Sequence, residues 1–135
     1  MTERELLEYV FCEREIEKLH RRYKEEEERM TLPRSSSMSG MPRGGGSDDP
    51  FLEILDHRTK LKERLDAVKT DRLVAERRLE RAYAVLNSEQ ERDVFDELYR
   101  YGKRIAQACD SLHFAKSYVY QIRRQILSRI ADVTA

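Results

Sequence analysis

The stretch GKRIAQACDSLHFAKSYVYQIRRQIL, residues 102–127, contains the pattern that decides the fold of this chain. Its apolar residues recur every three or four positions, the spacing that gathers them on one face of an α-helix. The spacing is interrupted once, at residues 112–114, which predicts two short helices joined by a tight turn. The apolar faces are Ile105, Ala108, Cys109 and Leu112 in the first helix, and Val119, Ile122, Ile126, Leu127 and Ile130 in the second.

The charge of this region differs from that of the rest of the chain. The 135 residues carry 26 basic and 26 acidic side chains, so the net charge is zero. Residues 100–131 nevertheless hold seven basic side chains against Asp110 alone, a net charge of +6. A helix pair with a cationic surface is typical of a DNA-binding helix-turn-helix. A helical bundle with a cationic solvent face is the alternative interpretation of the same pattern.

The outward side of the second helix is the candidate DNA interface. A helix in the major groove reads base edges with residues near its N-terminal half, and neighbouring cations neutralise phosphates. The predicted base-reading residues are Lys116, Ser117, Tyr120 and Gln121. The predicted phosphate contacts are Lys103, Arg104, Arg123, Arg124 and Arg129. On this hypothesis Lys116→Ala and Gln121→Ala relax sequence preference, whereas Arg123→Ala weakens binding to all DNA alike.

A capped helix is predicted ahead of this pair. Ser88 followed by Glu91 has the spacing of a capping box, and Gly102 is suited to end the helix that begins there. The apolar run between them consists of Val94, Phe95, Leu98 and Tyr99. Residues 88–135 are therefore predicted to form a small helical unit of their own.

Two longer amphipathic segments make up the N-terminal part. Residues 1–31 predict one amphipathic helix, and residues 51–87 predict a long helix with a heptad repeat. Residues 32–50, rich in Ser, Gly and Pro, predict a flexible linker with Pro50 in the first turn of the next helix. The predicted fold class is all-α, with a long coiled-coil-like helical hairpin followed by a small helix-turn-helix unit.

The heptad segment carries two apolar registers that need a partner. One register contains Ile54, Leu61, Val68, Ala75 and Ala82, and the other contains Phe51, Leu65, Leu79 and Leu86. Arg58 and Arg72 interrupt the second register. The partner of this seam is either the first helix of the same chain or a second chain, so a homodimer through the heptad helices stays an open alternative.

The C-terminal pattern resembles region 4 of bacterial sigma factors, the helix-turn-helix that reads the promoter −35 element. The matching positions are Gly102, Ala108-Cys109, Leu112, Phe114 and the run YVYQI…IL..I from Tyr118 to Ile130, aligned without a gap. The sequence departs from that pattern at three positions. Ala108 replaces a larger core residue, His113 stands where Gly is usual, and Ala115 replaces the capping Ser or Thr.

The chain as a whole is similar to small phage and prophage regulators of the ArpU/RinA type. The resemblance rests on the acidic N-terminal helix, the linker signature MPRGGGSDDP at 41–50, the heptad helix and the sigma-like tail. It implies a DNA-binding transcriptional regulator of phage genes. The resemblance further implies an activator that works with host RNA polymerase in the cytoplasm of the bacterial host cell, whereas the residues themselves leave activation and repression open.

The sequence offers no catalytic constellation. Its three histidines are isolated, Cys12 and Cys109 lack disulfide or metal-ligand spacing, and no apolar run approaches the roughly 20 residues of a membrane span. No enzymatic activity, cofactor, metal or membrane partner is therefore expected. The alternative function is a helical protein-interaction module, a phage-encoded adaptor or inhibitor of a host protein that does not bind DNA.

Overall fold

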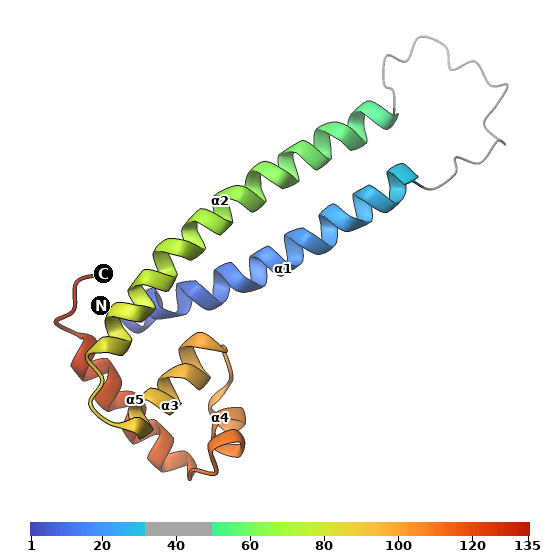
Figure 1. Cartoon of the computed structure of the whole chain (residues 1–135). Helices are drawn as coiled ribbons and strands as arrows, with labels where there is room; N and C mark the ends of the chain where they lie inside the picture. Colours follow the sequence, from blue (N-terminus) through green and yellow to red (C-terminus); the bar gives the residue numbers. More distant parts are fainter. Residues whose placement is uncertain (32–49) are drawn as a thin grey trace, which may run out of the picture. The chain divides into compact units, whose positions relative to one another are not determined.

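The computed structural model describes residues 1–31 and 50–135, which form helices joined by short turns (Figure 1). The elements are α1 (Glu3–Thr31), α2 (Pro50–Ala84), α3 (Glu89–Phe95), the π-helical turn η2 (Asp96–Arg100), α4 (Ile105–Leu112) and α5 (Lys116–Ile130). These residues contain no strand, which confirms the predicted all-α class. Pro50 begins α2, and the rest of the predicted linker lies outside the described residues.

The chain divides into two compact units, each of which includes part of α1 and part of α2. The terminal unit contains Met1–Arg14 and Lys69–Ala135, and the middle unit contains Glu15–Val68. The sequence predicts a separate unit for residues 88–135, whereas the structure joins these residues to the beginning of α1 and the end of α2.

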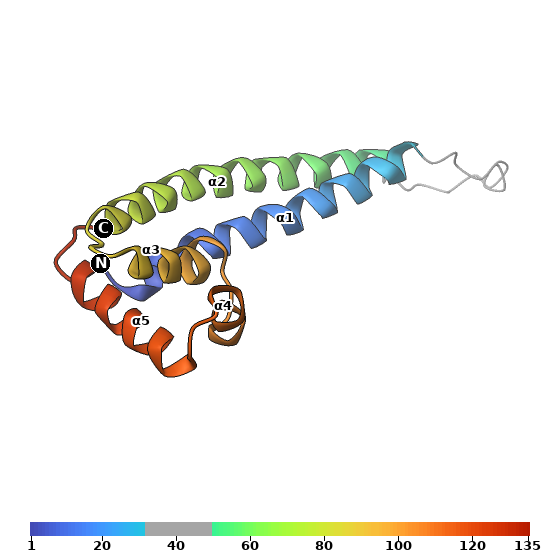
Figure 2. The ribbon, with the colours of Figure 1, turned by 60° about the horizontal axis from the view of Figure 1, so that its bottom comes forward.

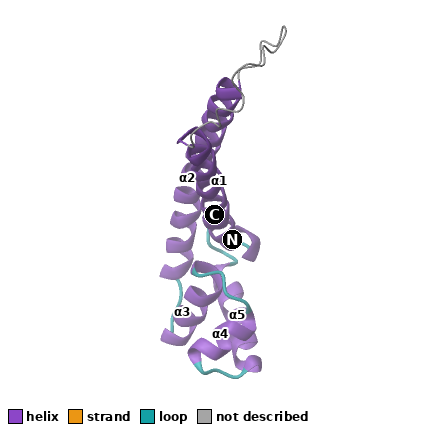
Figure 3. Cartoon of the chain, turned by 90° about the vertical axis from the view of Figure 1, so that its right-hand side faces the viewer, coloured by secondary structure: helices purple, strands orange, loops and turns teal. Residues whose placement is uncertain are grey.

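The terminal unit has one hydrophobic core, to which all of its helices contribute. In this unit α3, α4 and α5 gather around one another (Figures 2 and 3). The buried residues are Leu6, Tyr9, Ala75, Leu79, Ala82, Leu86, Val94, Phe95, Leu98, Tyr99, Ala108, Val119, Ile122, Ile126 and Ile130. The ring centre of Phe95 lies 5.8 Å from that of Tyr83 and 5.4 Å from that of Tyr99. Residues of α1 and α2 complete the core that residues 88–135 form in part, so these residues are not a separate unit.

In the middle unit, α1 and α2 pair in antiparallel orientation. Arg64 of α2 lies 3.2 Å from Glu15 of α1, and His57 of α2 lies 3.1 Å from Glu26 of α1. Residue numbers therefore rise along α1 while those of its partners on α2 fall, as expected for antiparallel helices. In this unit the apolar seam consists of Ile16, Leu19, Leu61, Leu65 and Val68, all buried. The seam of α2 therefore has a partner within the same chain.

The two arginines that interrupt the heptad register stack on tyrosines of α1. In the middle unit, Arg58 lies 4.6 Å from the ring centre of Tyr23 and donates a 2.9 Å hydrogen bond to its hydroxyl. In the terminal unit, Arg72 lies 5.9 Å from the ring centre of Tyr9. An aliphatic residue is usual at these heptad positions. An arginine can replace it opposite a tyrosine, because its aliphatic stem packs against the ring and its guanidinium makes a cation–π contact.

The beginning of α3 is fixed by the predicted cap. The hydroxyl of Ser88 accepts a 3.1 Å hydrogen bond from the backbone N–H of Glu91. The Glu91 carboxylate in turn accepts from the backbone N–H of Asn87 at 3.1 Å, one residue before the N–H that a standard capping box uses. Glu91 is almost fully buried, and its other oxygen accepts a 2.8 Å hydrogen bond from Arg129 of α5.

Gly102 ends this helical segment, as predicted, in the left-handed conformation with φ +67°. The backbone there is closed by hydrogen bonds from Tyr101 N–H to the Asp96 carbonyl and from Lys103 N–H to the Glu97 carbonyl, both 2.9 Å. A Cβ at Gly102 would lie 2.5 Å from a methyl carbon of Val10 in α1. Glycine is therefore required here both by backbone conformation and by space.

Candidate nucleic-acid interface

A tight turn joins α4 to α5 in the terminal unit. His113 adopts the left-handed conformation, with φ 57° and ψ 39°, at the position where the sigma-factor pattern has Gly. Phe114 follows, and its ring packs edge-on against that of Tyr118, with 5.1 Å between the two ring centres. Ala115 is the extended N-cap residue of α5, and its methyl group supplies no hydrogen bond to the first turn. The turn thus forms without the two residue types that usually favour it.

The helix α5 has one buried face and one exposed face. Val119, Ile122, Ile126 and Ile130 are buried in the core at helical spacing. The exposed face contains Lys116, Ser117, Tyr120, Gln121, Arg124, Gln125 and Ser128. Residues 116–130 include no Asp or Glu, so this face carries cations and neutral hydrogen-bonding groups only.

The structure brings the four predicted base-reading residues together on the first two turns of the exposed face. Lys116, Ser117 and Gln121 are exposed, and Tyr120 has 39% of its surface accessible. None of these four side chains has a hydrogen-bond partner among the described residues, so their polar groups are available for a ligand.

The five predicted phosphate contacts fall into two groups. Three are held by carboxylates: Lys103 by Glu97 at 2.5 Å, Arg123 by Glu3 at 2.7 Å and Arg129 by Glu91 at 2.8 Å. Arg104 and Arg124 are exposed and form no ion pair within the described part of the chain. Only these two are fully available to a polyanion.

The ion pairs also show why the charge count of residues 100–131 overstates the cationic surface. Arg100 is paired with Asp96 at 3.0 Å, so four of the seven basic residues are neutralised. Their partners, Glu3, Glu91, Asp96 and Glu97, all lie outside the counted range. The acidic residues of 89–97 were visible in the sequence, but the contribution of Glu3 depends on the tertiary fold.

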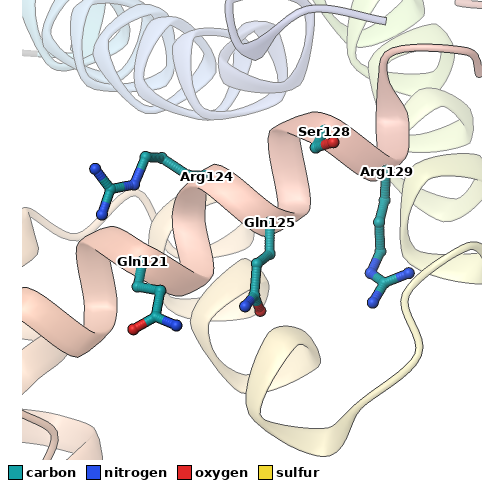
Figure 4. Close-up of a pocket in the computed structure, with 5 residues that line it drawn as sticks. All are labelled: Gln121, Arg124, Gln125, Ser128 and Arg129. Carbon is teal, nitrogen blue, oxygen red and sulfur yellow. The ribbon is translucent and has the colours of Figure 1, made fainter.

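A shallow hollow of about 480 Å³ follows the later turns of α5 (Figure 4). It is lined by Gln121, Arg124, Gln125, Ser128 and Arg129. Figure 4 shows the side chains of Gln121, Gln125 and Arg129 projecting from the same side of the helix. Sequence reasoning did not include Gln125 and Ser128 in the site. Their spacing of four and seven residues from Gln121 was the signal that could have identified them.

The beginning of α1 contacts α5 through a polar cluster centred on Glu3. The Glu3 carboxylate accepts hydrogen bonds from Arg123 Nε at 2.9 Å, Arg123 Nη2 at 2.7 Å and the Tyr99 hydroxyl at 3.1 Å. The hydrogen bonds from Arg123 lower the pKa of Glu3, and burial raises the pKa of the Tyr99 hydroxyl. Beside this cluster lies a cleft of about 260 Å³ that Arg104 and Tyr120 also line.

Comparison of the chain with models of protein families, with curated proteins and with solved structures finds no match. Among the described residues there is no group of three or more His, Cys, Asp or Glu side chains that could hold a metal ion. Over the same residues, no helix has both the length and the apolar character needed to cross a bilayer.

Proposed function

We propose that this protein binds double-stranded DNA through α5 and regulates transcription, with α4 and α5 acting as a helix-turn-helix. The observation that carries the proposal is the exposed face of α5, which lacks any carboxylate over residues 116–130. A carboxylate on that face would oppose the phosphate backbone, whereas its lysine, arginine, amide and hydroxyl groups are those that proteins use on DNA.

The packing of α5 supports the same function. One face is anchored by four buried aliphatic residues, so the other is presented on a fixed scaffold rather than on a mobile loop. Arg104, at the beginning of α4, and Lys116, at the beginning of α5, are exposed and unpaired cations within the described residues. We assign them to phosphates on the two sides of the groove, because cations flanking a reading helix fix its register on the duplex.

The biological setting of the proposal comes from the resemblance to ArpU/RinA-type regulators. In that setting the protein acts at phage or prophage promoters as an activator, together with the RNA polymerase of the bacterial host. The deciding experiment is selection of bound duplexes from a random pool, followed by transcription in vitro with host polymerase. Retention of no duplex at low salt would refute DNA binding. An unchanged transcript level on a template with the selected site would refute activation.

A protein-interaction surface is the second candidate function. Phe11 is 57% exposed and Tyr101 is 64% exposed, and both lie in the terminal unit. The segments that carry these two residues are in contact. Val10, next to Phe11, contacts Gly102, next to Tyr101, and Arg14 donates a 3.3 Å hydrogen bond to the Gly102 carbonyl. Exposed aromatic side chains are enriched in protein interfaces. A Phe11→Ser, Tyr101→Ser variant that binds DNA normally but no longer activates transcription would assign this surface to a protein partner.

A further inference from the structure

The hollow on the later turns of α5 contains hydrogen-bonding groups that the protein itself does not use. The side chains of Gln121, Arg124, Gln125 and Ser128 are exposed and have no hydrogen-bond partner within the described residues. Gln121 and Gln125 are one turn apart, and Arg124 and Ser128 are also one turn apart. The four therefore form two adjacent rows on one side of the helix.

Arg129 closes the far end of this hollow in a fixed position. Its guanidinium donates a 2.8 Å hydrogen bond to the Glu91 carboxylate, which is 2% exposed and also binds the N–H of Asn87. The buried Glu91 carboxylate, which accepts both hydrogen bonds, holds Arg129 against α3. One end of the hollow is thus formed by a side chain that an ion pair already orders, so that side chain adds little to the ordering cost of binding a ligand.

The chemistry of the free side chains matches purine edges. A glutamine amide can donate to N7 and accept from N6 of adenine, and an arginine can donate to O6 and N7 of guanine. The eight residues from Gln121 to Ser128 span about 10 Å along the helix, which corresponds to about three base pairs. Lys116, in the first turn, carries a compact point charge that suits a phosphate better than a base pair.

We propose that Gln121, Arg124 and Gln125 read a purine-containing segment of about three base pairs in the major groove, adenines with the glutamines and a guanine with Arg124. Base reading is thereby placed on residues 121–125 of α5, whereas the sequence places it on residues 116–121. This inference rests on the proposed function, because it assigns the bases read by the same helix.

The test compares duplexes selected by the full-length protein and by single variants. Gln125→Ala removes one proposed adenine contact, and Arg124→Ala removes the guanine contact. Lys116→Ala removes a cation of the first turn, and Gln90→Ala removes an exposed glutamine of α3 and serves as the matched control. Thermal unfolding of each variant establishes that these surface substitutions leave the fold intact.

Each proposed contact is expected to act at one position of the selected site. Gln125→Ala should lose about 5- to 150-fold discrimination at an adenine, and Arg124→Ala should lose a similar factor at a guanine. Lys116→Ala should weaken all sequences alike, and Gln90→Ala should select the wild-type site.

The inference is overturned if Gln125→Ala and Arg124→Ala still select the wild-type site, or if the wild-type protein binds duplexes without sequence preference. In both cases salt-dependent binding to duplex DNA would remain, so the proposed function would survive in its general form. Absence of any duplex binding by the wild type would overturn both.

Discussion

Glu3, in the first turn of α1, binds Arg123, in the middle of α5, through two hydrogen bonds of 2.9 and 2.7 Å. The two residues are 120 positions apart in the sequence. A bidentate pair of this kind has the strongest geometry that an arginine and a carboxylate can adopt. It connects the beginning of the chain to the helix that we assign to DNA.

Glu3→Gln is expected to lower the free energy of unfolding by about 1–2 kcal/mol, since both partners are only partly exposed and the pair is bidentate. Chemical denaturation at pH 7 measures the change. Asp110→Asn removes an exposed carboxylate that has no partner among the described residues, and it should leave the free energy of unfolding within about 0.5 kcal/mol of wild type. An equal loss in both variants would contradict the assigned role of the pair.

The same pair predicts a pH dependence. The pKa of Glu3 is lowered from its ordinary value of 4.5 in the folded protein, mainly by the hydrogen bonds from Arg123. Its contribution to stability is therefore complete above pH 4.5 and is lost as the pH falls through the lowered folded value. Relative to Glu3→Gln, the wild type should be more stable at pH 7 and should lose that advantage in acid. A difference between the two proteins that stays constant from pH 7 to pH 3 would exclude this linkage.

Arg123 and Arg124 are adjacent in sequence but should give opposite results when replaced. Arg123→Ala breaks the pair with Glu3, so it should lower the free energy of unfolding by about 1–2 kcal/mol and change DNA affinity little. Arg124→Ala removes an exposed, unpaired cation, so it should leave stability unchanged and reduce DNA affinity. Fluorescence anisotropy with a selected duplex and denaturation of the same samples measure both effects. Equal losses of DNA affinity would restore Arg123 as a phosphate contact.

Two substitutions in the turn between α4 and α5 should stabilise the protein. Ala115→Ser supplies the missing hydrogen-bond acceptor at the N-cap of α5 and should add about 1 kcal/mol to the free energy of unfolding. His113→Gly relieves a left-handed backbone and should add up to about 1 kcal/mol. Thermal and urea denaturation test both variants. A loss of stability for Ala115→Ser would show that Ala115 does not cap α5 as described.

Gly102→Ala should destabilise the terminal unit by about 2 kcal/mol or more, because it combines a left-handed backbone with a steric clash. The clash is with Val10, which lies 2.5 Å from the position of the added Cβ. The double variant Gly102→Ala, Val10→Ala separates the two causes. Val10→Ala should lower the free energy of unfolding less in the Gly102→Ala background than in the wild type. In the Gly102→Ala background it also removes the methyl groups that clash with the added Cβ. Strict additivity of the two losses would argue against the contact between α1 and Gly102.

The local features of the fold were predictable from short-range patterns. The cap at Ser88, the helix end at Gly102, the break at residues 112–114 and the start of α2 at Pro50 all follow from residue types with strong backbone preferences. The buried face of α5 follows from the spacing of its aliphatic residues. The candidate site was predictable to the same extent, because the exposed face of a helix is the complement of its buried face.

The sequence by itself therefore determined the all-α class and the two faces of α5, because these depend on contacts between residues a few positions apart. The tertiary structure decided which charges remain available on those faces. Glu3 neutralises Arg123 and Glu91 neutralises Arg129, so the cationic surface is smaller than the count of basic residues indicates. An ion pair depends on distances of a few ångströms between side chains that can be more than a hundred residues apart. No local pattern encodes such a distance, so only the packing of α1 and α3 against α5 reveals it.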